Sequence, residues 1–385
     1  MMRRDLILED TTLRDGEQAP GVAFSKRTKL AILDKLISIG VKWIEPGIPA
    51  MGGDELDALR EIAERKNEAM LIAWNRGIRE DIAFSLDLGF NAVHIGLPTS
   101  KIHLSDSIGK DRNWLLKQSA DLVKYAKDRG AFVSISAEDV GRTEIMFLQE
   151  YAASVAEAGA NRLRLSDTIG ILNPSRYAQL VAGAKSASSI DVQCHCHNDF
   201  GLAIANTIAG LEAGARYFHV CVNGMGERAG MPDLAQMCMA LKHLYDRDLG
   251  IKTEGLTELA KMVAHASNQP VPAWQPVVGD NVFAHESGIH TKGMLKNTNT
   301  FEPFSPDEVG GERRLVMGKH SGRALLKRVL EDSHVEVQED VLSLCLAEVR
   351  HAAIQRQGPV SSAQLCEIYA RLAHEHGTKA AEKAA

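Results

Sequence analysis

Two histidines separated by a single residue, His195 and His197, lie in a segment with the composition of a β-strand. Side chains alternate between the two faces of a strand, so both imidazoles are predicted to point the same way. Asn198 and Asp199 follow at once, and imidazole nitrogens with oxygen donors suit a divalent metal. The alternative is a pair of half-buried histidines at a strand end, and this motif alone does not decide between them.

A second group that could do chemistry lies near the start of the chain, where Arg14 precedes the carboxylate candidate Asp15. Two histidines and one carboxylate would leave a metal with open positions for a substrate. Such a cation acts as a Lewis acid on a bound carbonyl. The neighbouring arginine could then stabilise a developing alkoxide.

The elements that must position these residues follow a repeated pattern, in which a helical stretch ends in glycine and a β-rich run follows. Glycine closes a helix in the left-handed conformation and lets the chain turn into the next strand. Five strands are predicted in this way. Three further β-rich runs bring the number to eight, and apolar residues at helical spacing lie between the strands. The predicted strands are residues 6–9, 41–45, 70–74, 90–95, 131–136, 160–165, 191–195 and 215–220. This number of βα units in about 250 residues predicts a TIM (β/α)8 barrel, and a doubly wound open sheet is the alternative.

Polar residues gather where the predicted strands end, which in a barrel is the face that carries catalytic groups. Each could instead cap a helix or form an ordinary turn, but their joint position on one rim favours a site. The groups are residues 10–18, Glu45, residues 74–76, residues 134–139, residues 166–168, His195 with His197, and Asn223.

A glycine-rich segment, residues 223–230, follows the eighth predicted strand and leads into a helix opened by Pro232 and Asp233. Glycine-rich backbone before a helix N-terminus suits phosphate, and barrels often bind phosphate after strands 7 and 8. The glycines could equally be turn residues.

The barrel pattern ends near residues 268–276, where three prolines indicate a linker. We expect a catalytic domain over residues 1–267, a linker and irregular subdomain over 268–320, and a small helical region over 321–385. Helices are predicted at residues 321–332, 337–355 and 361–374. His285 and His290 lie in the irregular segment, where a mobile acid or base is expected. For His94 and His103, which flank the fourth predicted strand, a structural role is favoured.

The composition is that of an ordinary soluble enzyme, with 45% hydrophobic and 24% charged residues. A net charge of −6 gives no basic footprint for nucleic acid, and no apolar run is long enough to span a membrane. The first residues lack the apolar segment of a signal peptide. The six cysteines have no regular spacing and are expected to be reduced thiols, so a cytoplasmic location is expected.

Taken together, three motifs resemble a known family. Residues 10–18, 195–203 and 223–228 are similar to the acyl-CoA carboligases of the DRE-TIM metallolyase superfamily, which include homocitrate, 2-isopropylmalate and citramalate synthases. The resemblance covers nearly the whole chain. It is closest to the homocitrate synthases of nitrogen-fixing bacteria, which residues 16–24, 47–52, 285–290 and 318–322 match. The allosteric C-terminal domain of isopropylmalate synthases is expected to be absent, because too few residues remain.

The resemblance implies that acetyl-CoA and a 2-oxo acid, with 2-oxoglutarate expected, give a 2-hydroxy-2-carboxymethyl diacid (here homocitrate) and free CoA. It implies a homodimer with shared active sites, in which the irregular subdomain covers the partner's site. A divalent metal (Zn, Mn, Mg, Co or Fe) would bind Asp15, His195 and His197. The implied catalytic residues are Arg14, Glu138 and His290, where His290 comes from a partner subunit. Substrate would contact Gln18, Glu45, Asn75, Ser134 and Thr168, and CoA would meet Asn223, Gly224, Gly226 and Arg228.

The chain departs from the family pattern in three places. Met231 stands where many relatives have an asparagine metal ligand, and Phe301 where they have a tyrosine beside the catalytic histidine. Ser134 and Asn75 replace an arginine and a histidine that grip the distal carboxylate of 2-oxoglutarate in lysine-pathway homocitrate synthases. These replacements leave other oxo acids open, namely phosphonopyruvate (giving phosphonomethylmalate), pyruvate and 2-oxoisovalerate.

The residues disfavour three further classes of protein. Metal-dependent hydrolases on this barrel usually carry the paired histidines on the first strand, whereas here they lie on the seventh. Lyases that cleave hydroxymethylglutaryl-CoA are disfavoured by the long C-terminal region with His290. A catalytically dead scaffold is disfavoured by the intact set of Arg14, Asp15, His195 and His197.

Overall fold

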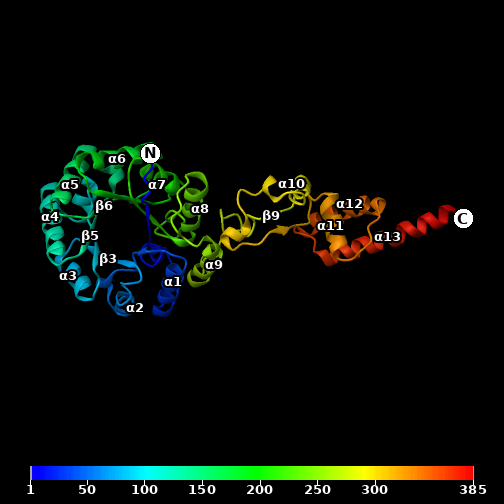
Figure 1. Cartoon of the computed structure of the whole chain (residues 1–385), viewed down its shortest axis with the longest axis horizontal. Helices are drawn as coiled ribbons and strands as arrows, with labels where there is room; N and C mark the ends of the chain where they lie inside the picture. Colours follow the sequence, from blue (N-terminus) through cyan, green and yellow to red (C-terminus); the bar gives the residue numbers. More distant parts are fainter. Residues whose placement is uncertain (1, 385) are drawn as a thin grey trace. The chain divides into compact units, whose positions relative to one another are not determined.

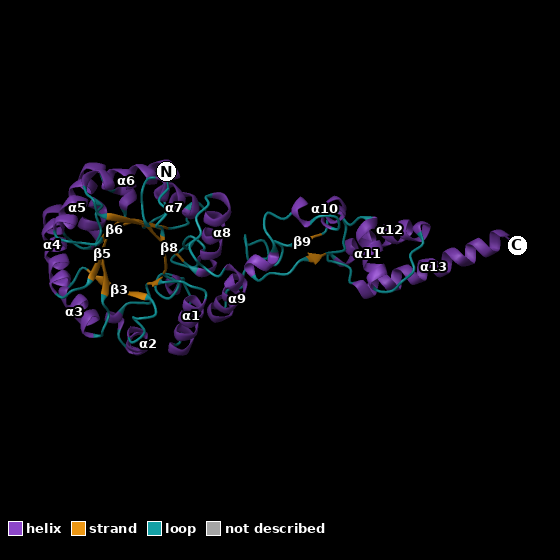
Figure 2. Cartoon of the chain, viewed as in Figure 1, coloured by secondary structure: helices purple, strands orange, loops and turns teal. Residues whose placement is uncertain are grey.

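The computed structural model describes residues 2–384, and side chains through residue 378. Eight parallel strands close into a barrel in sequential order, with β8 paired to β1. Figure 2 shows the ring of strands inside the ring of helices. The TIM barrel predicted from the sequence is therefore confirmed. The strands are β1 (Ile7–Asp10), β2 (Trp43–Ile44), β3 (Met70–Arg76), β4 (Ala92–Gly96), β5 (Phe132–Glu138), β6 (Arg162–Asp167), β7 (Asp191–Cys196) and β8 (Tyr217–Val220).

Helices surround the ring of strands, as the blue-to-green part of Figure 1 shows. They are α1 (Lys26–Ser38), α2 (Gly53–Ala63), α3 (Arg79–Asp87), α4 (Arg112–Asp128), α5 (Ile145–Glu157), α6 (Pro174–Ala187), α7 (Ala203–Glu212), α8 (Leu234–Leu244) and α9 (Leu256–Ser267). The glycines predicted to close helices all adopt positive φ angles, from 78° to 108°. This conformation is the one in which glycine lacks the steric cost of a side chain. Those glycines are Gly40, Gly89, Gly130, Gly159 and Gly214.

Apolar side chains fill the layer between the strands and the helices, but the inside of the barrel is unusually polar. Arg162 and Arg164 are almost completely buried there, whereas branched apolar residues fill most such barrels. The Arg162 guanidinium lies 4.9 Å from the centre of the Tyr217 ring and 5.6 Å from the rings of Trp43 and Phe132. Arg162 and these aromatic residues each begin a strand, so they form a packed floor at the amino ends of the strands.

A second compact unit begins at Pro272, after a first unit that ends at Val271. It opens with an irregular segment that contains α10 (Gly288–Met294) and a two-stranded parallel sheet of β9 (Ala284–His285) and β10 (Arg314–Leu315). Three helices follow: α11 (Arg323–Asp332), α12 (Glu339–Arg356) and α13 (Ser362–Ala384). They share a core rich in leucine and valine. They overlap the three predicted helices, but α13 continues beyond its predicted end at residue 374. Among the described residues, no helix is both long and apolar enough to cross a bilayer.

Candidate active site and metal centre

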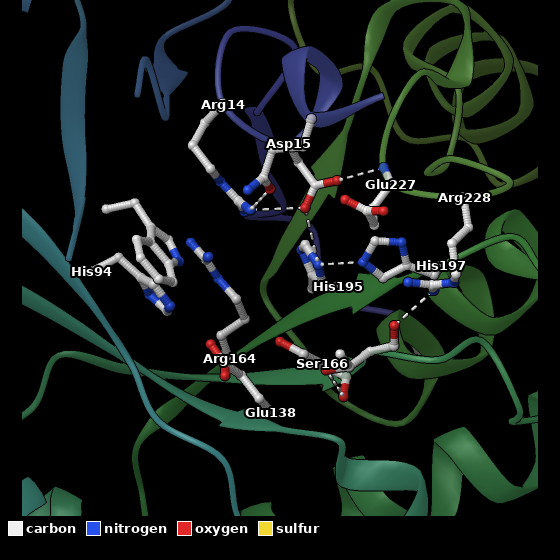
Figure 3. Close-up of a pocket in the computed structure, with 13 residues that line it drawn as sticks. Arg14, Asp15, His94, Glu138, Arg164, Ser166, His195, His197, Glu227 and Arg228 are labelled. Atoms are coloured by element: carbon white, nitrogen blue, oxygen red, sulfur yellow. Dashed lines mark hydrogen bonds and ion pairs between the residues drawn. The ribbon is translucent and has the colours of Figure 1, made fainter. Parts of the chain in front are cut away.

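A cavity of about 200 Å³ opens at the carboxyl ends of the strands (Figure 3). This is the face where TIM barrels carry their active sites. The volume is below the range of about 300–1,000 Å³ for drug-sized ligands, so the cavity suits a small acid and not an entire coenzyme. The predicted site residues that line it are Arg14, Asp15, Gln18, Glu138, Thr168, His195, His197 and Arg228.

Asp15, His195 and His197 turn toward one another in this cavity (Figure 3). The Nε2 atoms of the two histidines are 3.2 Å apart, and Asp15 Oδ2 lies 3.6 Å from Nε2 of His195. The alternation of β7 places both imidazoles on one face. Asp15 reaches them because the backbone after β1 turns back on itself, with the Thr11 carbonyl accepting from the amides of Arg14 and Gly16.

The three ligand atoms fit a metal ion. All lie within 4.8 Å of one another, and all three side chains are buried. Two nitrogens bound to one tetrahedral zinc at 2.0–2.1 Å would be about 3.3 Å apart, close to the separation of the two Nε2 atoms. A carboxylate with two imidazoles also leaves positions open for other ligands. The residues that would hold a divalent metal are thus brought together as the sequence predicts.

The protonation states also suit metal ligands. Burial lowers the pKa of His195 and of His197 below the usual range, so both imidazoles are neutral near pH 7. Burial alone would raise the pKa of Asp15, but the charge of Arg14 and the hydrogen bond from the Glu227 amide oppose it, and the net pKa is lowered. The centre therefore offers one carboxylate and two imidazole lone pairs.

Arg14 is held between two carboxylates at the edge of the cavity. Its Nε donates to Glu45 Oε1 at 2.6 Å, and its Nη1 donates to Asp15 Oδ2 at 2.8 Å and to Gln18 Oε1 at 3.2 Å. Glu45 is fully buried and also accepts from Arg164 Nη2 at 2.5 Å. Burial opposes ionisation of Glu45, but Arg14 and Arg164 lower its pKa to about 2. Glu45 thus positions two arginines and does not itself line the cavity.

Glu138, at the end of β5, has a pKa that is shifted in the opposite direction to the pKa values of Asp15 and Glu45. Burial raises its pKa above the ordinary value, which the charge of Arg14 only partly offsets. Its Oε1 accepts from Ser136 Oγ at 3.3 Å. A carboxyl group with a raised pKa in a cavity is a candidate proton carrier.

Like Glu45, five other predicted site residues of the barrel do not line the cavity. Asn75 faces outward from β3, where its amide donates to two backbone carbonyls and accepts from Ser85 Oγ. Ser134 lies inside the barrel beneath His94, and Asn223 donates to the Ala260 carbonyl of α9. Gly224 and Gly226 supply only backbone. Any substrate or CoA contact of these residues stays a prediction.

The glycine-rich turn has a close-packing role next to the candidate metal ligand. A side chain on Gly226 would place Cβ 2.9 Å from Asp15 Oδ1, and the amide of Glu227 donates to the same oxygen at 3.4 Å. Arg228 pairs with Asp199 at 2.8 Å and donates to the Thr168 carbonyl at 2.7 Å. Met231, which follows this turn, is buried.

Some residues that line the cavity were not predicted as site residues: Trp74, His94, Arg164, Ser166 and Glu227. Strand alternation could have found some of them, because Arg162, Arg164 and Ser166 share one face of β6, opposite its leucines. Trp74 and Ser166 were noted at the rim but given no role. His94 was assigned a structural role, yet its imidazole faces the cavity.

In the second unit, His290 is exposed on α10 and stacks on Phe301, with ring centroids 4.0 Å apart. His285 is buried, and its Nε2 lies 3.5 Å from Glu302 Oε1. Glu302 is also held by Arg313. The catalytic role predicted for His290 stays a prediction.

The fold and the site define a (β/α)8-barrel protein with a carboxylate and two histidines at the carboxyl ends of its strands. The chain belongs to the HMGL-like family, whose model matches residues 5–263. A model described as homocitrate synthase post-HMGL domain-like matches residues 277–357. The family resemblance inferred from the motifs is thus confirmed at this level.

Relatives match along nearly the whole chain. It is 63% identical to a 2-phosphonomethylmalate synthase of Streptomyces rubellomurinus, over 97% of this chain and 100% of that protein. It is 41% identical to homocitrate synthase 1 of Nostoc sp., over 97% and 99% of the two chains. The crystal structure of a Bacillus subtilis HMG-CoA lyase is similar in fold, with a TM-score of 0.63 and 19% identity over 70% of this chain and 96% of that one.

Proposed function

We propose that this chain is an acyltransferase that condenses acetyl-CoA with a 2-oxo acid. Acetyl-CoA, the oxo acid and one water give a 2-hydroxy-2-carboxymethyl diacid and free CoA. The observation that carries the proposal is the convergence of Asp15, His195, His197 and Arg14 in one small cavity. The full-length similarity to synthases that differ in their named products supports it.

In this proposal a divalent cation on Asp15, His195 and His197 supplies Lewis-acid chemistry to the keto acid. Arg14 presents its guanidinium to the oxygen on which negative charge develops as the ketone becomes an alkoxide. The ion pairs with Glu45 and Asp15 fix the direction of that guanidinium before substrate arrives. This preorganisation favours the charged transition state over the neutral ketone.

A base must remove a proton from the acetyl methyl group before the carbanion attacks the ketone carbon. Glu138 is proposed to take part in this proton transfer, because burial raises its pKa above the usual range of a carboxyl group and it lines the cavity. His290 is proposed as the partner base from a second subunit, because it is exposed on α10. The domains proposed are the barrel over residues 1–267, the covering segment over 268–320 and the helical region over 321–385.

For the oxo acid, we propose phosphonopyruvate, and 2-oxoglutarate is the competing candidate. The relative named 2-phosphonomethylmalate synthase supports this choice through its 63% identity. The chemistry of His94 supports an acid with a second anionic group, as both candidates are. His94 is fully buried in the cavity wall, and its Nε2 has no hydrogen-bond partner among the described residues.

The proton on His94 can be assigned from its neighbours. Arg162 Nε donates to Ser134 Oγ at 2.9 Å, and Ser134 Oγ lies 2.9 Å from His94 Nδ1. Arginine only donates, so Ser134 Oγ accepts from Arg162, and we assign the serine hydroxyl proton to the hydrogen bond with Nδ1. Burial keeps the pKa of His94 well below the usual range, so its single proton lies on Nε2. A buried N–H donor without a partner favours an anionic ligand over the isopropyl group of 2-oxoisovalerate.

The test is release of free thiol from acetyl-CoA by the purified, metal-supplemented protein with each of five oxo acids. These are phosphonopyruvate, 2-oxoglutarate, oxaloacetate, pyruvate and 2-oxoisovalerate. The highest kcat/KM is expected with phosphonopyruvate. A preference for 2-oxoglutarate would overturn the substrate assignment alone, and release with none of the five would overturn the reaction.

A further inference from the structure

A histidine outside the cavity contacts one of the proposed metal ligands from behind. His219 lies on β8 and is fully buried. Its Nδ1 is 2.8 Å from Nδ1 of His195, and its Nε2 is 2.8 Å from Oε1 of Glu9 on β1. Glu9, His219 and His195 therefore form one continuous chain of hydrogen bonds that ends at the candidate metal centre.

The direction of each hydrogen bond in this chain follows from the carboxylate at its end. An ionised carboxylate only accepts, so His219 Nε2 must donate to Glu9. A neutral imidazole carries one proton, so His219 Nδ1 is an acceptor and His195 Nδ1 must donate to it. The proton of His195 is thereby held on Nδ1. Its Nε2 then presents a lone pair toward Asp15 and His197, which is the state that a metal ligand requires.

Two arginines of β6 reach Glu9 across the inside of the barrel and keep its carboxylate ionised, so that it only accepts hydrogen bonds. Its Oε2 lies 2.5 Å from Nη1 of Arg162, and its Oε1 lies 3.4 Å from Nη2 of Arg164. All four groups of this network are buried, so no bulk water competes for the carboxylate. An amide at position 9 would turn its oxygen to Arg162 and its NH2 to His219. That exchange would reverse the chain and place the His195 proton on Nε2.

We propose that His219 and Glu9 are positioning residues that set the tautomer of His195 and so prepare the barrel for its metal. The inference rests on the proposed function, because it takes His195 as a metal ligand. Neither residue lines the cavity, so neither touches substrate. Outer partners of this kind typically contribute 10–100-fold to metal affinity.

Glu9→Gln is the decisive variant, because it keeps the shape of the side chain at position 9 and reverses the direction of its hydrogen bond with His219. Zinc affinity of the metal-free protein, measured against a competing chelator, is expected to weaken about 10–100-fold. His219→Phe is expected to weaken it similarly, and His219→Gln to restore part of the loss through its amide oxygen. Tyr151→Phe is the control, because it removes a buried hydrogen bond of the barrel, from the hydroxyl to the Ser136 carbonyl, and should leave zinc affinity unchanged.

Nitrogen NMR of histidine-labelled, metal-free wild-type protein reads the tautomer without metal or activity. The expected spectrum has the His195 proton on Nδ1, and a proton on Nε2 would overturn the inference even if Glu9→Gln does not fold. Equal zinc affinity of wild type and a folded Glu9→Gln would also overturn it. A wild-type protein that binds zinc nowhere in the barrel would instead contradict the proposed function.

Discussion

The Nε2 atoms of His195 and His197 lie 3.2 Å apart on one face of β7. Cys194, which precedes His195, and Cys196, which lies between the two histidines, are buried on the opposite face. Burial raises the pKa of Cys194 to about 12. The thiols are therefore neutral and unsuited to bind metal. The two faces of one strand thus separate the candidate ligands from residues that could have competed with them.

Removing a ligand should remove metal and activity together. For Asp15→Ala and His195→Ala we expect the bound metal to fall to background and thiol release to be lost, because two remaining ligands hold a divalent ion poorly. Metal content by mass spectrometry, with turnover on the same samples, checks this. A variant that retained both metal and turnover would contradict the ligand assignment.

Arg14→Lys tests whether the planar guanidinium matters and not only its charge. Lysine cannot contact Glu45 and Asp15 with a fixed fork, so the group facing the alkoxide would no longer be oriented. We expect kcat to fall about 100–1,000-fold, the usual effect of losing one such donor, while bound metal remains. Turnover measured at saturating oxo acid separates a loss of kcat from weaker substrate binding. An unchanged kcat would contradict the role proposed for the Arg14 guanidinium.

His94→Phe should change substrate preference without removing metal. The loss of a hydrogen bond to a charged group, about 1.5–3 kcal/mol, corresponds to roughly 10–100-fold in kcat/KM for phosphonopyruvate and 2-oxoglutarate. The value for 2-oxoisovalerate should stay level or rise. Ser134→Ala should show the same trend more weakly, since the histidine remains. An equal loss with all oxo acids would show that His94 only supports the fold.

His290→Ala should keep the metal in the barrel and lose turnover. If the site is shared between subunits, mixing this variant with Asp15→Ala should restore activity in the heterodimers that contain one intact site. Size-exclusion chromatography with light scattering establishes whether dimers form at all. Full activity of His290→Ala alone would show that His290 takes no part in the reaction. If both variants are dimeric and mixing them restores no activity, the proposal of a shared site would be contradicted.

Asp10 offers a prediction about stability and pH. Burial raises its pKa from 3.8 to about 7, despite hydrogen bonds from Thr12. The unfolded chain loses this proton first, so the carboxylate destabilises the fold as pH rises above about 4, and the full cost is present above pH 7. Asp10→Asn should match wild type at pH 4 and gain about 4 kcal/mol at pH 8, roughly 5 °C in Tm. A constant difference across pH would contradict this.

The sequence predicted the fold well because its signals are local. The pattern of a helix closed by glycine and followed by a β-rich run recurs five times and is read within ten residues each time. Strand alternation places His195 beside His197. The network of Glu9, His219, Arg162 and Arg164 was not predicted, because residues far apart in the chain meet only when β1 closes against β8. The position of His94 in the cavity wall was not predicted for the same reason. Its unpaired nitrogen becomes evident only when Ser134 and Arg162 are seen beside it.

The aromatic residues packed around Arg162 close the barrel at its amino end. The cavity is consequently open at the carboxyl ends of the strands, and molecules enter and leave it by the same route. Whichever molecule rests deepest must arrive before the larger one that covers it, and it can depart only after that larger molecule has gone.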